Sequence, residues 1–209
     1  MEPAKVVRLA KRRGLDGIAV TDHDTIEGAL EARGHAGDGF LVIVGEEVTT
    51  RAGDIIGLFL TERVEGGDPV AAIEAIHAQG GVALLPHPFT KTLGVDEQVA
   101  RMLDACEGFN HRYSADDRTS EAAPFALEYD LTMTGSSDAH RYRDIGCGRT
   151  TAPADTPEGI REALLKGNVT YAAHRPGTGL TAWYALADTV KWIVDPIPER
   201  LLYHHEEAH

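Results

Sequence analysis

The stretch GIAVTDHDT at residues 17–25 joins a short apolar run to three consecutive ionisable side chains, Asp22, His23 and Asp24. The apolar run is typical of a buried strand. A loop after such a strand needs only solubility, which Ser, Gly or Lys would supply. A histidine between two carboxylates therefore indicates that chemistry takes place where this strand ends.

The chain alternates between helical and strand patterns as far as residue 174. This alternation predicts parallel strands covered by helices, either as a closed barrel or as an open doubly wound sheet. The sequence has no Gly-rich phosphate loop of the GxGxxG or GxxxxGKS type, which disfavours a nucleotide-binding open sheet. Thr25 and Asp68 are expected to cap the second and third helices. The predicted helices are 3–13, 26–36, 69–81, 95–106, 117–129 and 156–168, and the predicted strands are 16–22, 40–50, 53–60, 82–88, 107–111, 131–140 and 169–174.

Polar side chains able to bind metal or substrate lie at the ends of these strands. The carboxyl ends of parallel strands share one face, where barrel enzymes build their sites, so we expect these side chains to converge. Histidine and carboxylate together suit zinc, manganese and iron. A carboxylate such as Glu47 can bridge two ions, which can activate water and hold a phosphoryl oxygen. In strand order the residues are Asp22–His23–Asp24, Glu46–Glu47, Asp54, His87, Asn110–His111, and Asp138 with His140.

Each of these residues also has a structural interpretation when taken singly. Asp22 could cap the following helix, and His87, between two prolines, could belong to a turn. Because neighbours on a strand point to opposite faces, one of Glu46 and Glu47 is expected to be solvated. His77 lies in the middle of a predicted helix and is expected at the surface. The prediction of a shared site therefore rests on the coincidence of such residues at successive strand ends.

Length and charge restrict the class of protein. The 209 residues suit one main domain, expected at residues 1–176, followed by a helical extension at 177–209. The net charge of −13 argues against nucleic acid or an anionic membrane surface as the main partner. Two cysteines without ligand-like spacing, and no apolar run of signal-peptide or membrane-spanning kind, lead us to expect a cytoplasmic protein.

The motifs together resemble those of the PHP family, the polymerase and histidinol phosphatase domains. The order and spacing agree over residues 5–173, and TDHD, HP and SDAH in combination are specific. The resemblance implies an α/β fold, a distorted (β/α)7 TIM-like barrel, and metal-dependent hydrolysis of a phosphate mono- or diester with two or three divalent ions (Mn, Zn or Fe). It also implies a small phosphorylated substrate. The matching segments are TDHDT, GEEVTT, GDIIGLFL, GGVALLPHP, FNHR and GSSDAH.

The resemblance assigns roles to individual residues. His23 would bind one ion together with His140, and Glu47 would bridge two others. His87 would bind one of the bridged ions and Asp138 the second. These assignments make His23, His140 and Glu47 the catalytic candidates.

Four further residues receive roles by the same resemblance. Asp54 stands where many members have a histidine, and its carboxylate can replace imidazole as a ligand. Asn110 and Arg112 stand where the family has polar residues near the substrate. Arg112 or Arg141 could hold a phosphate, with a surface salt bridge as the structural alternative.

The sequence departs from the family at its start. Family members begin with a strand reading HxH and a loop that offers an aspartate, both before the helix that here starts at Pro3. We therefore expect a barrel that lacks its first strand, with weak metal loading and low activity of this polypeptide alone. Two alternative functions follow: a catalytically degenerate regulatory or structural module, and a metal-dependent amidohydrolase-like enzyme.

Overall fold

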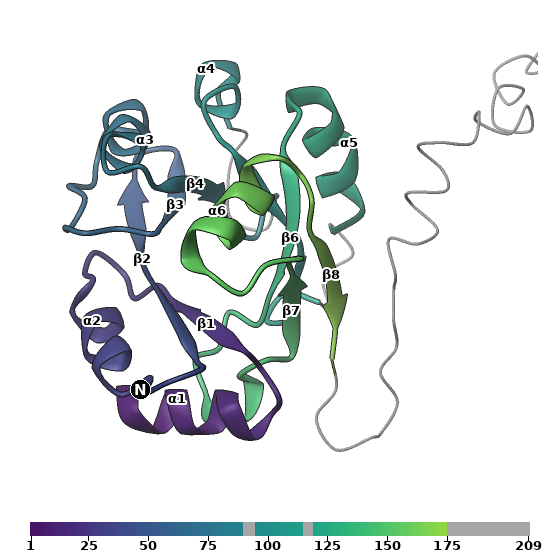
Figure 1. Cartoon of the computed structure of the whole chain (residues 1–209). Helices are drawn as coiled ribbons and strands as arrows, with labels where there is room; N and C mark the ends of the chain where they lie inside the picture. The colour runs from purple at the N-terminus through teal and green to yellow at the C-terminus, as the bar shows by residue number, and fades with distance from the viewer. Residues whose placement is uncertain (90–94, 115–118, 175–209) are drawn as a thin grey trace, which may run out of the picture.

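The structure, a computed structural model, describes residues 1–89, 95–114 and 119–174. The predicted alternation of helices and strands is confirmed (Figure 1). The elements are α1 (Pro3–Arg12), β1 (Gly17–Val20), α2 (Glu27–Gly34), β2 (Leu41–Thr50), β3 (Gly53–Leu58), α3 (Pro69–Ala78), β4 (Val82–Leu85), α4 (Glu97–Ala100), β5 (Ala105–Asn110), α5 (Thr119–Tyr129), β6 (Thr132–Ser136), the 3-10 helix η1 (Tyr142–Asp144), β7 (Gly148–Thr151), α6 (Pro157–Leu165) and β8 (Thr170–Ala173).

Six strands form one sheet in the order β1-β2-β3-β4-β5-β6, and the sheet curls into a half barrel. The expectation that all strands are parallel is wrong for β3, which runs antiparallel to both β2 and β4. Only Arg51 and Ala52 separate β2 from β3. A link of two residues can make a hairpin but not the crossover that parallel neighbours require. The hairpin places Asp54, at the start of β3, directly opposite Thr49 near the end of β2.

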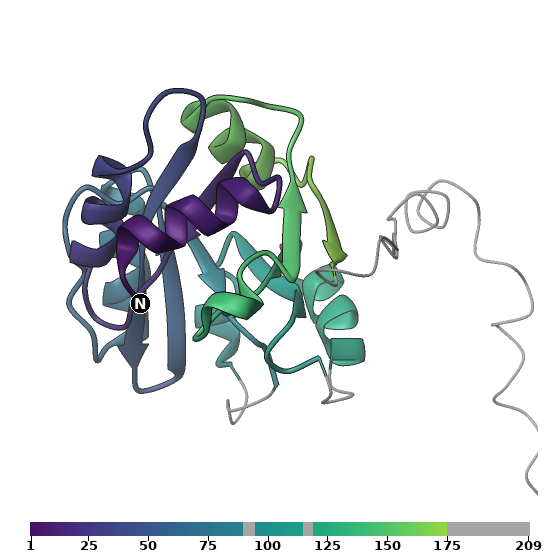
Figure 2. The same cartoon turned by 90° about the horizontal axis from the view of Figure 1, so that it is seen from below.

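Helices cover both faces of the sheet. Side chains alternate along β3, so that Ile55 joins the core under α3, α4 and α5, while Ile56 packs with α6. Figure 1 shows α3, α4 and α5 in an arc around the sheet and α6 inside this arc. A third core holds α1 against α2 and β2, and in Figures 1 and 2 α1 lies across one end of the molecule.

One predicted helix cap is present, and two other predictions about helix ends are corrected by the structure. The side chain of Asp68 accepts a hydrogen bond from the Ala71 N–H at 3.0 Å, as its predicted capping role requires. Thr25 accepts from the Glu27 N–H at 3.2 Å, but the N-cap of α2 is Ile26, which has no side-chain cap. The predicted helix 95–106 is wrong beyond α4, because its last residues begin the buried strand β5.

The strands β7 and β8, which α6 separates in the chain, pair antiparallel as a separate two-stranded sheet beside β6. The last predicted strand is present as β8, whereas β7 was not predicted. The Thr150 hydroxyl bridges the two sheets, since it accepts from the Gly135 N–H and donates to the Gly135 carbonyl, both at 2.9 Å. This two-stranded sheet therefore supports β6 close to the residues that follow it.

Both cysteines are free and buried. Burial, together with the negative charge of Glu107, raises the pKa of the Cys106 thiol to about 12. At pH 8 only about one Cys106 side chain in 10⁴ is then a thiolate, the reactive form. We expect iodoacetamide at pH 8 to leave Cys106 unmodified in the native protein and to label it fully in guanidinium, as measured by peptide mass spectrometry. Labelling of native Cys106 at the rate of an exposed thiol would contradict this packing.

The expected extension at residues 177–209 lies outside the described residues, so the division at residue 176 stays a prediction. Among the helices that the structure describes, none combines the length and apolar character needed to cross a bilayer.

Candidate metal centre

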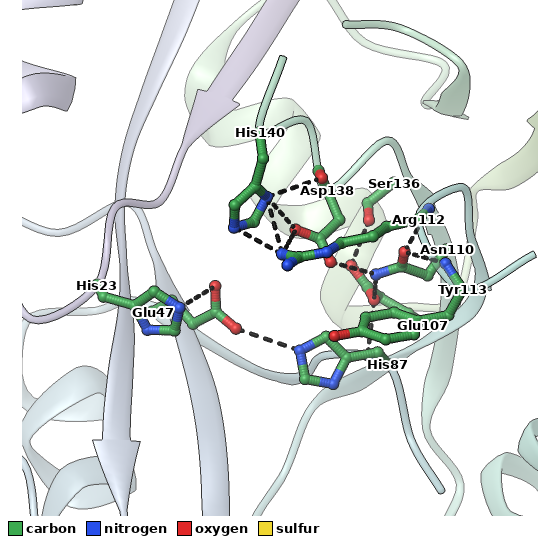
Figure 3. A network of polar contacts seen from close by, with 10 residues as sticks. All are labelled: His23, Glu47, His87, Glu107, Asn110, Arg112, Tyr113, Ser136, Asp138 and His140. Atoms are coloured by element: carbon green, nitrogen blue, oxygen red, sulfur yellow. Dashed lines mark hydrogen bonds and ion pairs between the residues drawn. The ribbon is translucent and has the colours of Figure 1, made fainter. Parts of the chain in front are cut away.

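Polar side chains from five strands meet at one end of the sheet (Figure 3). They come from the loop after β1, from β2, from the loop after β4, from β5 and its following turn, and from the end of β6 and the loop after it. The residues are His23, Glu47, His87, Glu107, Asn110, Arg112, Tyr113, Ser136, Asp138 and His140.

Glu47 lies between two histidines that are far apart in the sequence. Its Oε2 is 3.6 Å from His23 Nε2, and its Oε1 is 3.3 Å from His87 Nε2. The backbone fixes this position, since the Glu47 N–H donates to the Asp22 carbonyl and the Glu47 carbonyl accepts from the Asp24 N–H, each at 3.1 Å. Glu47 and His87 are buried, whereas His23 is half exposed.

The surroundings of His87 favour positive charge. Burial alone lowers the pKa of His87, but the hydrogen bond to Glu47 and the negative charges of Glu107, Glu47 and Asp138 together raise it. The carboxylates thus create a negative field in a partly buried place. A bound cation would be stabilised by the same field.

Asp54 completes a group of three candidate ligands. His23, Glu47 and Asp54 each offer one donor atom, and these atoms lie within 4.8 Å of one another. The β2–β3 hairpin explains the proximity, because Asp54 pairs with Thr49, two residues beyond Glu47. One imidazole nitrogen and two carboxylate oxygens fit zinc, manganese or iron.

Asp138 and His140 form a second group with Arg112. His140 Nδ1 lies 3.2 Å from Asp138 Oδ1. Arg112 Nη1 lies 2.6 Å from Nε2 and 2.9 Å from Nδ1 of His140, and 3.7 Å from Asp138 Oδ1. Among the described residues, the group of three donor atoms within 4.8 Å includes His23 but not His140. The ion that the resemblance places between His23 and His140 stays a prediction.

The backbone at three strand tips has an unusual conformation. Asp24, His87 and Asp138 have φ angles of +54°, +30° and +42°. Residues other than glycine rarely adopt such angles, and they gather where a function requires them. These angles turn the chain sharply after β1, β4 and β6.

Glu107 is a functional candidate that the sequence analysis missed. Its carboxylate is buried in β5 and accepts hydrogen bonds from the His87 N–H at 2.6 Å, from Asn110 Nδ2 at 2.7 Å, and from the Ser136 hydroxyl. Burial raises the pKa of Glu107, and the three donors oppose that rise. The signal in the sequence is an acidic residue inside the otherwise buried run ACEGFN.

The predicted substrate residues occupy different environments. Asn110 is buried, and its amide is engaged by four protein groups. Arg112 is half exposed at the edge of the cluster. Arg141 is exposed, and no hydrogen bond or ion pair joins its side chain to the cluster within the described part of the chain.

The expectation that Glu46 or Glu47 is solvated is wrong, because both are buried. Glu46 does point to the opposite face from Glu47, but the segment after β3 covers it. Its Oε2 accepts from the Val64 N–H at 2.8 Å, and Arg63 Nε lies 3.7 Å from Oε1. Desolvation raises the pKa of Glu46, with the Val64 hydrogen bond and the Arg63 charge opposing it.

The structure also tests the structural interpretations of Asp22 and His77. The capping role considered for Asp22 is wrong, since the N-cap of α2 is Ile26 and has no side-chain cap. His77 is partly exposed on α3 and pairs with Asp104 at 2.9 Å, in agreement with its expected surface position.

A cavity of about 430 Å³ lies at the opposite end of the sheet, lined among others by Phe40, Phe59 and Arg161. Its lining includes none of the candidate residues. The candidate chemistry is therefore located at the strand tips and not in this cavity.

The chain is similar in sequence to one family profile and to two archaeal proteins. The PHP-associated family profile matches residues 119–169. Two uncharacterised proteins of Methanocaldococcus jannaschii are 41% and 32% identical to this chain over 114 residues, which are 52% and 50% of this chain. The matches cover 66% and 48% of those proteins, so the chain spans only part of their length.

Two solved structures are similar in fold. A two-domain protein of Bacteroides vulgatus, containing a predicted PHP-like metal-dependent phosphoesterase, has a TM-score of 0.71 and 25% identity over 83% of this chain and 60% of its own. An amidohydrolase from Chromobacterium violaceum, solved with bound sulfate, has a TM-score of 0.57 and 17% identity over 85% of this chain and 94% of its own, which shows a common fold alone. The family match and the Bacteroides structure agree with the order of the motifs, and both support the assignment of the chain to the PHP family.

Proposed function

We propose that the protein is a metal-dependent hydrolase of phosphate mono- or diesters, built on a (β/α)7 barrel of which β1–β6 form a part. The observation that carries the proposal is the position of Glu47, a buried carboxylate between His23 and His87. Donor atoms of His23, Glu47 and Asp54 lie within 4.8 Å of one another. The Bacteroides protein, described as containing a predicted phosphoesterase, supports the reaction class.

The chain's own residues divide into ligands and substrate groups. His23, Glu47 and Asp54 would hold one ion, and His87 would share Glu47 with a second. When bound, a divalent ion supplies a coordinated water of lowered pKa and polarises a phosphoryl oxygen. Manganese, zinc or iron fits the nitrogen and oxygen donors, with two or three ions in a complete site.

Two half-exposed residues would then meet the substrate. The Arg112 guanidinium, 42% exposed at the cluster, would bind anionic oxygens of a small phosphorylated molecule. His140, 51% exposed, would give a proton to the leaving oxygen. The two buried free cysteines are consistent with a reducing, cytoplasmic setting.

Amide hydrolysis is the second candidate, favoured by the description of the Chromobacterium protein as an amidohydrolase. Hydrolysis of p-nitrophenyl phosphate, bis(p-nitrophenyl) phosphate and p-nitroacetanilide by protein loaded with Mn²⁺ or Zn²⁺ separates the two reactions. We expect slow, metal-dependent cleavage of a phosphate substrate, which a chelator removes and added Mn²⁺ restores. Preference for the anilide, or phosphate cleavage that survives the combined Glu47→Ala and His87→Ala substitutions, would contradict the proposal.

A further inference from the structure

A buried hydrogen-bond network lies beneath the candidate ligands. The Glu107 carboxylate receives donors from three strand ends: the His87 N–H after β4, Asn110 Nδ2 at the end of β5 and the Ser136 hydroxyl at the end of β6 (Figure 3). A buried carboxylate is costly to desolvate, and an apolar residue of similar size would serve stability as well. Stability alone therefore does not account for an acid at this position.

Asn110 extends the network to the surface. Its Nδ2 donates to Asp138 Oδ2 at 3.3 Å as well as to Glu107, and its Oδ1 accepts from the N–H groups of Arg112 at 2.9 Å and Tyr113 at 3.3 Å. An amide side chain offers two donors and two lone pairs. All four are used within the protein, so Asn110 holds other groups in place and has no capacity left for a substrate.

We infer that Glu107 and Asn110 act together as positioning residues that set the places of His87, Asp138 and Arg112. The inference rests on the proposed function, in which His87 is a metal ligand and Arg112 binds the substrate. The resemblance adds Asp138 as a second metal ligand. His87 and Asp138 have left-handed backbones, which persist only where surrounding contacts hold them. Glu107 holds His87 by accepting a hydrogen bond from the His87 backbone N–H. Asn110 holds Asp138 by donating a hydrogen bond to the Asp138 carboxylate.

Metal affinity tests the inference. We expect Glu107→Gln and Asn110→Ala each to weaken Mn²⁺ binding in calorimetry by about 10- to 100-fold, the usual effect of losing a partner behind a ligand. Glu107→Ala should lose more than Glu107→Gln, because glutamine keeps one acceptor oxygen. The variant that combines Glu107→Gln with Asn110→Ala should bind Mn²⁺ little more weakly than the single variant with the lower affinity, since the two residues act as one unit.

Thr132→Val is the matched control. The Thr132 hydroxyl donates to the Leu164 carbonyl at 2.6 Å and is buried at the far end of β6, so this variant also loses a buried hydrogen bond. Its melting temperature should fall, while its Mn²⁺ affinity stays within twofold of the wild type. An equal loss of affinity in Thr132→Val, or unchanged affinity in folded Glu107→Gln and Asn110→Ala, would overturn the inference.

Crystal structures of the metal-free wild type, Glu107→Gln and Asn110→Ala give a second measurement that needs no metal. We expect the His87 backbone to leave its left-handed conformation in Glu107→Gln and the Asp138 carboxylate to shift in Asn110→Ala. Unchanged positions in both variants would overturn the inference. A wild type without Mn²⁺ affinity would instead contradict the proposed function, and these structures would still decide the role of Glu107 and Asn110.

Discussion

Replacement of Glu47 by glutamine is expected to weaken Mn²⁺ binding by more than about a hundredfold. Loss of a residue that only hydrogen-bonds to a metal ligand already lowers metal affinity about 10- to 100-fold, and Glu47 is itself a proposed ligand. Glu47 is the acid that both His23 and His87 face, at 3.6 Å and 3.3 Å. Glutamine keeps the shape of the side chain but loses the charge that attracts a cation. Calorimetry with Mn²⁺, together with metal analysis after dialysis, measures the effect.

Glu46→Gln is the control for this substitution. Glu46 is the preceding residue on the same strand and is also buried, but it lies on the opposite face under Val64 and Arg63. Its replacement should leave Mn²⁺ affinity within about twofold of the wild type, because only charges close to the ion act strongly on it. Equal losses from Glu46→Gln and Glu47→Gln would mean that general acidity, and not a defined site, binds the metal.

Arg112→Ala is expected to have two opposite effects. Arg112 Nη1 lies 2.6 Å from His140 Nε2, and the same imidazole lone pair cannot serve an arginine proton and a metal ion together. The resemblance also makes His140 a metal ligand, and without Arg112 a cation meets no competitor there. Mn²⁺ affinity should therefore rise about tenfold, the equivalent of one charge-assisted hydrogen bond. The KM for a phosphate ester should also rise about tenfold or more, because the anion loses its guanidinium partner.

Calorimetry and steady-state kinetics on the same Arg112→Ala preparation measure both effects. Arg143→Ala is the control, since Arg143 is a neighbouring exposed arginine that pairs with Asp144 at 3.5 Å and lies outside the cluster. It should change neither quantity. Weaker Mn²⁺ binding by Arg112→Ala would show that Arg112 supports the metal centre instead of competing with it.

The order of elements could be predicted from the sequence because hydrophobic patterns and helix caps are local signals. Asp68 and Pro69 mark the start of α3 in the sequence, and the structure places them at the N-cap and first position of that helix. The direction of β3 was predicted wrongly because the strand pattern is the same in both directions. The two-residue link, Arg51 and Ala52, was the signal that required a hairpin.

Burial of charged residues was the least predictable feature of the site. The burial of Glu46 could not be predicted, because alternation along a strand does not reveal that the chain near Val64 returns to cover this side chain. Glu107 was missed because its donors, the His87 N–H and the Ser136 hydroxyl, come from segments about 20 to 29 residues away in the sequence. Such contacts exist only once the sheet is assembled.

Anomalous diffraction from crystals grown with Mn²⁺ or Zn²⁺ tests most directly whether acids and histidines from separate strands bind a cation. We predict an anomalous peak about 2.0–2.3 Å from His23 Nε2 and from carboxylate oxygens of Glu47 and Asp54. A protein saturated with metal whose crystals show no peak among these three residues, or a peak elsewhere only, would contradict the account.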